Sequence, residues 1–360
     1  MLIIACISSH GYGHGARVAA LLGALHRQEP DCHFVLSTAL APAFLAQVFQ
    51  GIPFEQRPCQ WDVGVVQADA LGSDPEATLL ALEKLESELP ALLDSETAYL
   101  QDLLCRHPGP ALVLGDVPPA AVLLAQRLGL PLIWQANFGW DAIYKEMGPA
   151  FSPWAQHCAQ LYGQGQAVIS CPFSLPMPWG IPSWQVGLSC GQPAFSEQQL
   201  RQQLRLSHPR ERTALLSFGG LGFQLDPALL ALWPHWHFLV NDPSLAQAAN
   251  ASLIPKQLRP LDLMPLCSRV LTKPGYSTFC EALSQGLGLL VVERQGFSEA
   301  AVLQAGLQQH GWHRLLQRQA FLGGAWQLDQ PLEPPLGSPL AKGGEIEGAA
   351  LLLDQLQSHS

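Results

Sequence analysis

Short runs of apolar residues alternate along this chain with longer segments in which apolar positions recur about every 3.6 residues. The short runs predict buried β-strands, and the longer segments predict helices with one buried face. In the first half we expect strands at 2–7, 33–38, 111–116 and 130–138, helices at 18–27 and 118–129, and one or two long helices over 77–107. This order predicts parallel strands whose carboxyl ends meet at one edge of a sheet, where ligands of such folds bind.

The second half of the chain repeats this alternation. It predicts strands at 213–220, 236–242, 269–272 and 287–293. A stretch rich in Pro, Gly and Trp, without periodicity, separates the two halves and is typical of a linker. We therefore predict an α/β fold of two Rossmann-like domains facing across a cleft: an N-terminal domain at 1–175, a linker at 176–195, a second domain at 196–340 and a C-terminal helix at 341–360.

Composition and charge narrow the classes of partner. Of the 360 residues 13% are charged, the formal net charge is −10, and no run of Lys or Arg occurs. This balance argues against nucleic-acid binding and leaves at most peripheral membrane contact. Nine cysteines are spread singly, without the spacing of a metal site, as in reduced proteins. No stretch approaches the ~20 apolar residues of a membrane span, so we predict a soluble, cytoplasmic protein.

A loop rich in glycine and histidine follows the first predicted strand. Gly11, Gly13 and Gly15 allow a tight turn and leave space for a ligand at the start of the next helix. His10 and His14 lie within this loop. A histidine at a helix start facing a cleft can move a proton. The alternative is a structural histidine that only hydrogen-bonds the backbone.

A second constellation follows the predicted strand at 269–272. Gly275, Tyr276, Ser277 and Thr278 open a helix, and Glu281 follows on the same face as Thr278. Free backbone amides and hydroxyl groups at a helix start suit a diphosphate, and a carboxylate there can accept hydrogen bonds from two ribose hydroxyls. The alternative interpretation is a capping box with no ligand.

These motifs, taken in order, resemble the two-domain nucleotide-sugar glycosyltransferases of the GT-B fold. The likeness rests on HGYGHGAR, GDVPPAAVLLAQRLGLP, NFGWDAIY, LLSFGG, KPGYSTFCEA and VERQGFSEA, and it spans 1 to about 316. It is greatest for glycosyltransferase-like proteins that share an HGYGHATR-type loop with the N-terminal region of plant arabinokinases. The chain is similar, more distantly, to the GlcNAc transferase of peptidoglycan lipid intermediates and to plant UDP-sugar glycosyltransferases.

The resemblance implies roles for individual residues. His14 matches the general base and Asp116 the aspartate that orients it. Gly275, Thr278 and Glu281 match the donor-binding glycine, hydroxyl and ribose-binding glutamate. The remaining expectations are Gly219 and Gly220 near the donor phosphates, Glu299 at the donor sugar, His10, Gly11 and Gly13 in a phosphate or acceptor loop with His10 as the alternative base, and Trp140 and Asp141 in the acceptor cleft.

The activity implied by the resemblance is transfer of a hexosyl or N-acetylhexosaminyl group, with inversion, from a nucleotide diphosphate sugar to a hydroxyl of a small-molecule, lipid or glycan acceptor. UDP is the expected nucleotide, and neither a metal nor a resident cofactor is expected. Two alternatives remain: a nucleotide-sugar 2-epimerase of the same fold, and a non-catalytic protein that binds sugar nucleotides. A dehydrogenase is disfavoured because the loop lacks the third glycine of its motif, and no P-loop sequence occurs.

Overall fold

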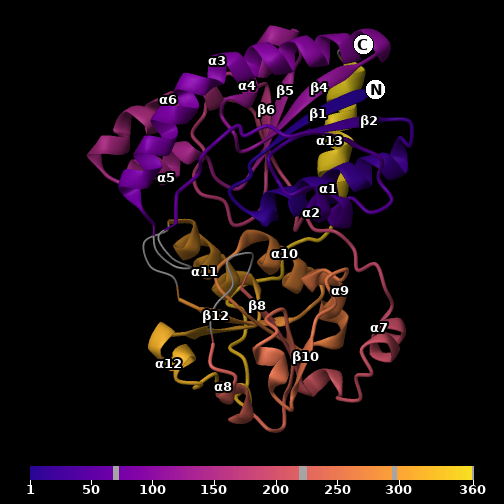
Figure 1. Cartoon of the computed structure of the whole chain (residues 1–360), viewed down its shortest axis with the longest axis vertical. Coiled ribbons are helices and arrows are strands. Elements are labelled where there is room, and N and C mark those ends of the chain that lie inside the picture. Colours follow the sequence, from indigo (N-terminus) through magenta and orange to yellow (C-terminus); the bar gives the residue numbers. More distant parts are fainter. Residues whose placement is uncertain (68–72, 219–224, 294–297, 359–360) are drawn as a thin grey trace. The chain divides into compact units, whose positions relative to one another are not determined.

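A computed structural model describes residues 1–67, 73–218, 225–293 and 298–358. Its contacts divide the chain into two compact units. Unit 1 consists of Met1–Ser189 together with Lys342–Ser360, and unit 2 consists of Cys190–Ala341. Each unit is built around its own parallel sheet (Figure 1).

Unit 1 contains a sheet of seven strands in the order β3-β2-β1-β4-β5-β6-β7. The strands are β1 (Leu2–Ile7), β2 (His33–Ser37), β3 (Glu55–Arg57), β4 (Ala111–Asp116), β5 (Leu132–Ala136), β6 (Ala167–Ser170) and β7 (Ser183–Gln185). The order reverses between β1 and β4. These two strands pair with each other, and Ile7 of β1 lies beside Asp116 of β4. The carboxyl ends of the strands at such a reversal form the usual binding crevice of an open parallel sheet.

The helices of unit 1 are α1 (Tyr12–Gln28), α2 (Pro42–Val48), α3 (Pro75–Arg106), α4 (Ala121–Leu128), α5 (Trp140–Glu146), α6 (Ser152–Tyr162) and α13 (Gly344–Ser358). The last of these, α13, returns from the end of the chain to lie beside α1 (Figure 1). Leu352 and Leu356 of α13 join the core that Leu21 and Leu25 of α1 form with the sheet. The apolar stripe of the predicted C-terminal helix is therefore buried in unit 1.

Helix α3 shows how local sequence sets the bounds of an element. Asp74 caps its first turn by accepting a hydrogen bond from the Ala77 amide at 3.0 Å, and Pro75 occupies the first helical position, where no amide donor is needed. The helix then continues to Arg106 with Pro90 in its interior. The segment predicted at 77–107 is therefore one helix.

Unit 2 has six parallel strands in the order β10-β9-β8-β11-β12-β13. They are β8 (Thr213–Ser217), β9 (His237–Val240), β10 (Ala251–Leu253), β11 (Arg269–Thr272), β12 (Gly288–Val292) and β13 (His313–Leu316). Its helices are α7 (Glu197–Gln203), α8 (Ala228–Ala231), α9 (Pro260–Leu263), α10 (Tyr276–Ser284), α11 (Ser298–His310) and α12 (Arg318–Leu322). The order reverses between β8 and β11, so the start of α10, just after β11, lies at the reversal.

The predicted fold class is confirmed, since both units are parallel α/β structures. One local expectation differs from the structure. The predicted linker, 176–195, contains β7, which pairs with β6 at the edge of the first sheet. A strand of three residues among prolines and tryptophans has too few positions for a period-2 pattern, so the sequence carried no strand signal there.

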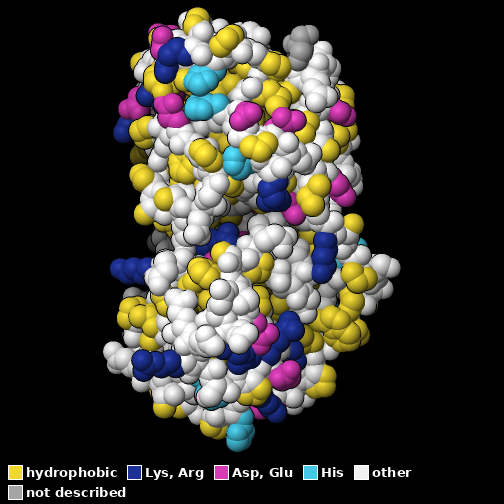
Figure 2. Space-filling view, turned by 90° about the vertical axis from the view of Figure 1, so that its right-hand side faces the viewer, with side chains coloured by type: hydrophobic (Ala, Val, Ile, Leu, Met, Phe, Trp, Pro, Cys, Tyr) yellow, Lys and Arg dark blue, Asp and Glu magenta, His cyan; other side chains and the backbone are white. Residues whose placement is uncertain are grey.

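The surface of the described residues carries charges of both signs. On the face shown in Figure 2, Lys and Arg side chains are interspersed with Asp and Glu. No helix within the described part of the chain combines the length and the apolar character needed to cross a bilayer.

Candidate active site

A histidine–aspartate pair lies at the reversal of the first sheet. Asp116 is the last residue of β4, and His14 lies in the first turn of α1, which follows β1. Because β1 and β4 are neighbours, their carboxyl ends bring the two side chains together. His14 Nδ1 lies 2.7 Å from Asp116 Oδ1. The aspartate is fully buried, whereas the histidine side chain keeps 11% of its surface exposed.

Arg17 completes this cluster, although it was not among the predicted site residues. Its guanidinium donates to both oxygens of Asp116, from Nε at 2.9 Å and from Nη2 at 2.8 Å. A third bond, from Nη1, reaches Asn137 Oδ1 at 2.6 Å. Arg17 lies three residues after His14, so both project from the same face of α1. That spacing was the signal available in the sequence.

The charges around Asp116 favour its ionised form. Burial alone would raise the pKa of this carboxyl, but Arg17 and His14 together lower the pKa below its ordinary value. An ionised carboxylate only accepts hydrogen bonds, so the short contact assigns the Nδ1 proton to His14. Nε2 of His14 is then the nitrogen that can accept a proton.

The backbone after Asp116 is held in a rare conformation. Val117 has φ +79°, a value that a β-branched residue seldom adopts and that costs about 1–3 kcal/mol. Tyr162 Oη donates to the carbonyl oxygen of Val117 at 2.6 Å and accepts from the Trp140 amide at 3.1 Å. These bonds tie the end of β4 to α5 and α6, and they fix where the Asp116 carboxylate lies.

The other loop histidine, His10, has the opposite arrangement of its ring nitrogens. The Val65 amide donates to His10 Nδ1 at 3.4 Å, so the neutral ring carries its proton on Nε2. The ring also packs edge-on against Trp140, with centroids 5.2 Å apart. A Cβ on Gly64 would lie 2.3 Å from His10 Nδ1. Of the two histidines, His14 therefore has the tautomer suited to a general base.

The loop glycines differ in their physical roles. Gly11 caps α1 in an extended conformation open to any residue, and no described atom lies within 4 Å of a Cβ placed there. Gly15 is required for packing, because a Cβ would lie 2.7 Å from the Phe44 ring. Gly13 lies within the first turn of α1. Space beside Gly11 is available to a ligand.

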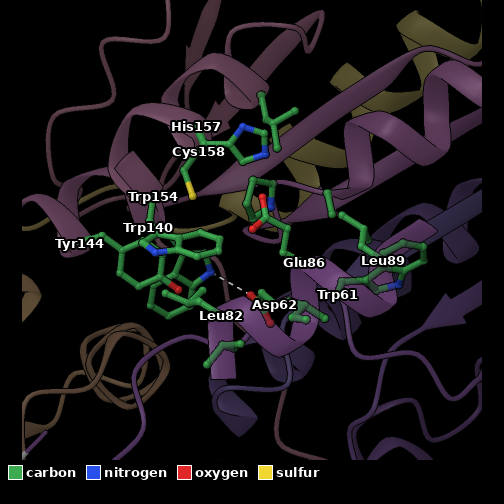
Figure 3. Close-up of a pocket in the computed structure, with 15 residues that line it drawn as sticks. Trp61, Asp62, Leu82, Glu86, Leu89, Trp140, Tyr144, Trp154, His157 and Cys158 are labelled. Carbon is green, nitrogen blue, oxygen red and sulfur yellow. Dashed lines mark hydrogen bonds between the residues drawn. The ribbon is translucent and has the colours of Figure 1, made fainter. Parts of the chain in front are cut away.

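The side chains of Trp140 and Asp141 have different hydrogen-bond partners. The Trp140 side chain is fully buried, and its indole Nε1 donates to Asp62 Oδ2 at 2.8 Å in the wall of a cavity (Figure 3). Asp141 Oδ2 accepts from Trp179 Nε1 at 3.2 Å. Asp141 is absent from the described lining of that cavity. Asp62 was not among the predicted site residues.

In unit 2, the start of α10 gathers the residues expected to bind the donor. Gly275 caps the helix, with Tyr276, Ser277 and Thr278 in its first turn. The N-cap residue is a glycine, so the Ser or Thr that a capping box needs at this position is not there. The capping-box alternative is therefore not formed, and the anion-binding interpretation remains a prediction.

Glu281 lies one turn into α10 in a charged setting. Burial raises its pKa to about 7, with Arg259 opposing and Asp262 adding to the shift. Arg259 is itself bound to Asp262, with Nη2 2.7 Å from Oδ1. Arg259 and Asp262 were not identified from the sequence, since they lie about 20 residues before Glu281 and only the fold brings the three charges together.

The structure describes only one of the two remaining sets of expected donor contacts. Gly219 and Gly220 fall outside the described residues. Glu299 lies in the first turn of α11. No group of three or more His, Cys, Asp or Glu in the described ranges is placed to hold a metal ion.

The two units match the fold of GT-B glycosyltransferases. Among solved structures similar to the chain is a UDP-glucosyltransferase from Polygonum tinctorium capable of glucosylating indoxyl, with TM-score 0.60, 15% identity and coverage of 99% of this chain and 92% of that chain. Another is a UDP-glucose: anthocyanidin 3-O-glucosyltransferase in complex with UDP, with TM-score 0.60, 14% identity and coverage of 99% and 94%. At these identities the similarity establishes the fold alone.

One curated relative is the L-arabinokinase of Arabidopsis thaliana, 27% identical over 328 residues. The match covers 89% of this chain, and the chain spans about a third (31%) of the length of that relative. No family model matches the chain. The predicted GT-B fold is confirmed and the expected arabinokinase relative is found, whereas the shared loop and the link to the peptidoglycan transferase stay predictions.

Proposed function

We propose that the chain transfers a sugar from a UDP-sugar to an acceptor hydroxyl with inversion at the anomeric carbon. The observation that carries this proposal is the His14–Asp116 contact of 2.7 Å at the carboxyl edge of a parallel sheet. The GT-B fold supports it, because the similar structures include a UDP-glucosyltransferase and a glucosyltransferase in complex with UDP. Fold likeness alone does not establish chemistry, so the support for this activity comes from the residues at the site.

In this proposal His14 is the general base. Its Nε2 takes the proton of the acceptor hydroxyl while the acceptor oxygen forms a bond to the anomeric carbon. The bond from that carbon to the diphosphate oxygen breaks, and the diphosphate leaves with the electron pair. Asp116 holds the imidazole in the reactive tautomer and stabilises the imidazolium.

Arg17 has a positioning role in this scheme. Its two bonds to Asp116 keep the buried carboxylate ionised and fixed in orientation. Its third bond anchors the guanidinium to Asn137 after β5. A proton that reaches His14 is therefore held on the imidazole, because Arg17 makes protonation of Asp116 unfavourable.

Unit 2 is proposed to bind the donor. The helix dipole and backbone amides at the start of α10 would receive the diphosphate, with Thr278 as a hydroxyl donor. Glu281 would accept hydrogen bonds from the ribose hydroxyls in its ionised form. No resident metal or cofactor is part of the proposal, and Glu299 is proposed to contact the sugar.

The experiment pairs nucleotide binding with turnover. UDP binding is measured by isothermal titration calorimetry, and transfer from UDP-glucose and UDP-N-acetylglucosamine is followed with and without a panel of hydroxyl acceptors. His14→Ala is expected to lower turnover by about 10²-fold or more, with the Kd for UDP within about twofold of the parent. His26→Ala is the matched control, because His26 lies in the last turn of the same helix.

Each alternative has a distinct result. Formation of a 2-epimer or a glycal from UDP-N-acetylglucosamine without acceptor would identify an epimerase. Tight UDP binding with no turnover of any donor would identify a non-catalytic binding protein. Loss of turnover in His10→Ala but not in His14→Ala would transfer the role of base to His10.

A further inference from the structure

Each unit contains a pair of stacked imidazole rings at the amino-terminal edge of its sheet. In unit 1 the ring of His33 lies on that of His107, with centroids 4.5 Å apart and planes inclined by 15°. In unit 2 the rings of His237 and His208 have centroids 4.4 Å apart and planes inclined by 21°. The candidate active-site residues follow the carboxyl ends of the strands, so no proposed catalytic step uses these pairs.

The two pairs occupy corresponding places in the two sheets. His33 is the first residue of β2, which pairs with β1, and His237 is the first residue of β9, which pairs with β8. Each partner comes from a segment between a helix and the next strand. His107 lies between α3 and β4, and His208 lies between α7 and β8. Each stack therefore holds a connecting segment against the start of a strand.

One ring nitrogen of each strand histidine is buried without a hydrogen-bond partner among the described residues. These nitrogens are His33 Nε2 and His237 Nδ1. The other ring nitrogen of His237 lies 2.9 Å from Ser252 Oγ. A protonated imidazole carries a hydrogen on both nitrogens, so protonation would bury an N–H group that has no acceptor. The fold therefore favours the neutral form of both strand histidines.

The charges around His33 act in the same direction. Burial lowers the pKa of His33, and the His107 ring adds to this shift. Glu55 of β3 opposes it, whereas Arg106 at the end of α3 and the amino terminus of the chain lower the pKa further. The groups that favour the neutral ring outweigh the one nearby carboxylate.

The second pair has fewer charged neighbours. Burial and the His208 ring together lower the pKa of His237 to about 4. Arg201 of α7 donates to the His208 carbonyl oxygen at 2.7 Å and places a further cation beside the stack. A second proton on this pair would therefore meet both a like charge and a buried setting.

We propose that the two histidine pairs form an acid-sensitive device that releases the connecting segments when the pH falls. Protonation of both rings of a pair places two cations at stacking distance and leaves a buried N–H group unpaired. The rings then separate, and the strand histidine gains access to water. The inference goes beyond the proposed function and does not depend on it.

The direction of the pH dependence follows from proton binding. An unfolded histidine binds its proton near pH 6.5, whereas folded His237 does so only near pH 4. The folded state binds fewer protons in this window, so the stability present above about pH 6.5 is lost as the pH falls toward 4. Burial raises the pKa of the Asp62 and Asp141 carboxyls, which act in the opposite sense. The informative quantity is therefore the difference between parent and variant.

The test replaces both strand histidines by phenylalanine, which keeps a ring for stacking but cannot be protonated. Tm of the full chain is measured between pH 8 and pH 5 for the parent and for the double variant His33→Phe/His237→Phe. The double variant is expected to lose about half as much Tm as the parent, or less. The matched control is His157→Phe/His235→Phe, which changes two exposed histidines and is expected to keep the pH dependence of the parent.

Hydrogen exchange locates the release. Protection of the backbone amides at 104–112 and 205–214 is compared at pH 5 and pH 8, after correction for intrinsic exchange rates. The parent is expected to lose about tenfold in protection at these segments at pH 5. The double phenylalanine variant is expected to keep its protection.

Substitution of the partner rings gives an independent measurement if the double variant does not fold. His107→Phe and His208→Phe remove the like charge and leave the strand histidines in place. The NMR titration midpoints of His33 and His237 are then expected to move to higher pH.

Three results would overturn the inference. These are an equal loss of Tm in the parent and the double variant, unchanged protection of both segments between pH 8 and pH 5, and midpoints of His33 and His237 that do not move when their partners are replaced. Loss of UDP binding or of turnover would count against the proposed function alone, because none of these measurements requires a ligand.

Discussion

Replacing Arg17 with methionine tests the cluster around Asp116 most directly. Methionine keeps an unbranched side chain but removes every donor. Three charge-assisted bonds are lost, at 2.9, 2.8 and 2.6 Å, and the fully buried Asp116 carboxylate keeps its hydrogen bond with His14. Breaking one partner of a buried ion pair costs about 3–5 kcal/mol. For a domain the size of unit 1, this lowers Tm by about 6–20 °C.

The same substitution changes the pH dependence of stability. Arg17 and His14 lower the pKa of Asp116 against the effect of burial. The carboxylate therefore contributes stability above its unfolded pKa of about 3.9, which is lost as pH falls through the lower folded pKa. Without Arg17 the pKa of Asp116 is depressed less. Arg17→Met is expected to lose stability at a higher pH than the parent in an acid titration followed by circular dichroism.

The pH dependence of catalysis is expected to change in the same variant. With Arg17 gone, Asp116 favours the protonated form of His14, which cannot act as a base. The acidic limb of kcat/KM against pH is therefore expected to move to higher pH.

Two further variants control the measurement. Arg27→Met makes the same change at an exposed position of the same helix and is expected to leave Tm and the pH profile unchanged. Arg17→Lys keeps the charge but loses the planar fork, so an intermediate loss is expected. A Tm for Arg17→Met within about 2 °C of the parent, with an unmoved acidic limb, would refute the role given to Arg17.

Two other predictions follow from the geometry. Burial raises the pKa of Glu281 to about 7, so UDP binding is expected to strengthen between pH 6 and pH 8 as the carboxyl ionises. Titration calorimetry should find that this pH dependence is absent in Glu281→Gln. The same pH dependence in the variant as in the parent would contradict the prediction. Gly64→Ala is expected to destabilise unit 1 by about 1–3 kcal/mol more than Gly51→Ala in urea unfolding. Both glycines have positive φ, but a Cβ at Gly64 would lie 2.3 Å from His10, whereas a Cβ at Gly51 would have no described neighbour within 4 Å. Equal losses of unfolding free energy in the two variants would show that the contact with His10 does not destabilise unit 1.

The amino-acid sequence by itself determined the class of fold. Strands buried on both faces need continuous apolar runs, and amphipathic helices between them force parallel connections, so the alternation of 2–7, 18–27 and 33–38 was enough to predict it. The strand–glycine loop–helix order placed His14 at a sheet edge, and the acid at the end of 111–116 placed Asp116 there too. These are local patterns, and local patterns can be read along a chain.

Only the tertiary structure decided which side chains meet. Arg17 reaches Asn137 across 120 positions, and Trp140 reaches Asp62 across 78. Strand β7 is too short for a pattern of its own, and its place follows from pairing with β6. Contacts of this kind depend on strand order and on how helices pack over the sheet. No spacing within the sequence encodes them, because the separation along the chain does not set the separation in space.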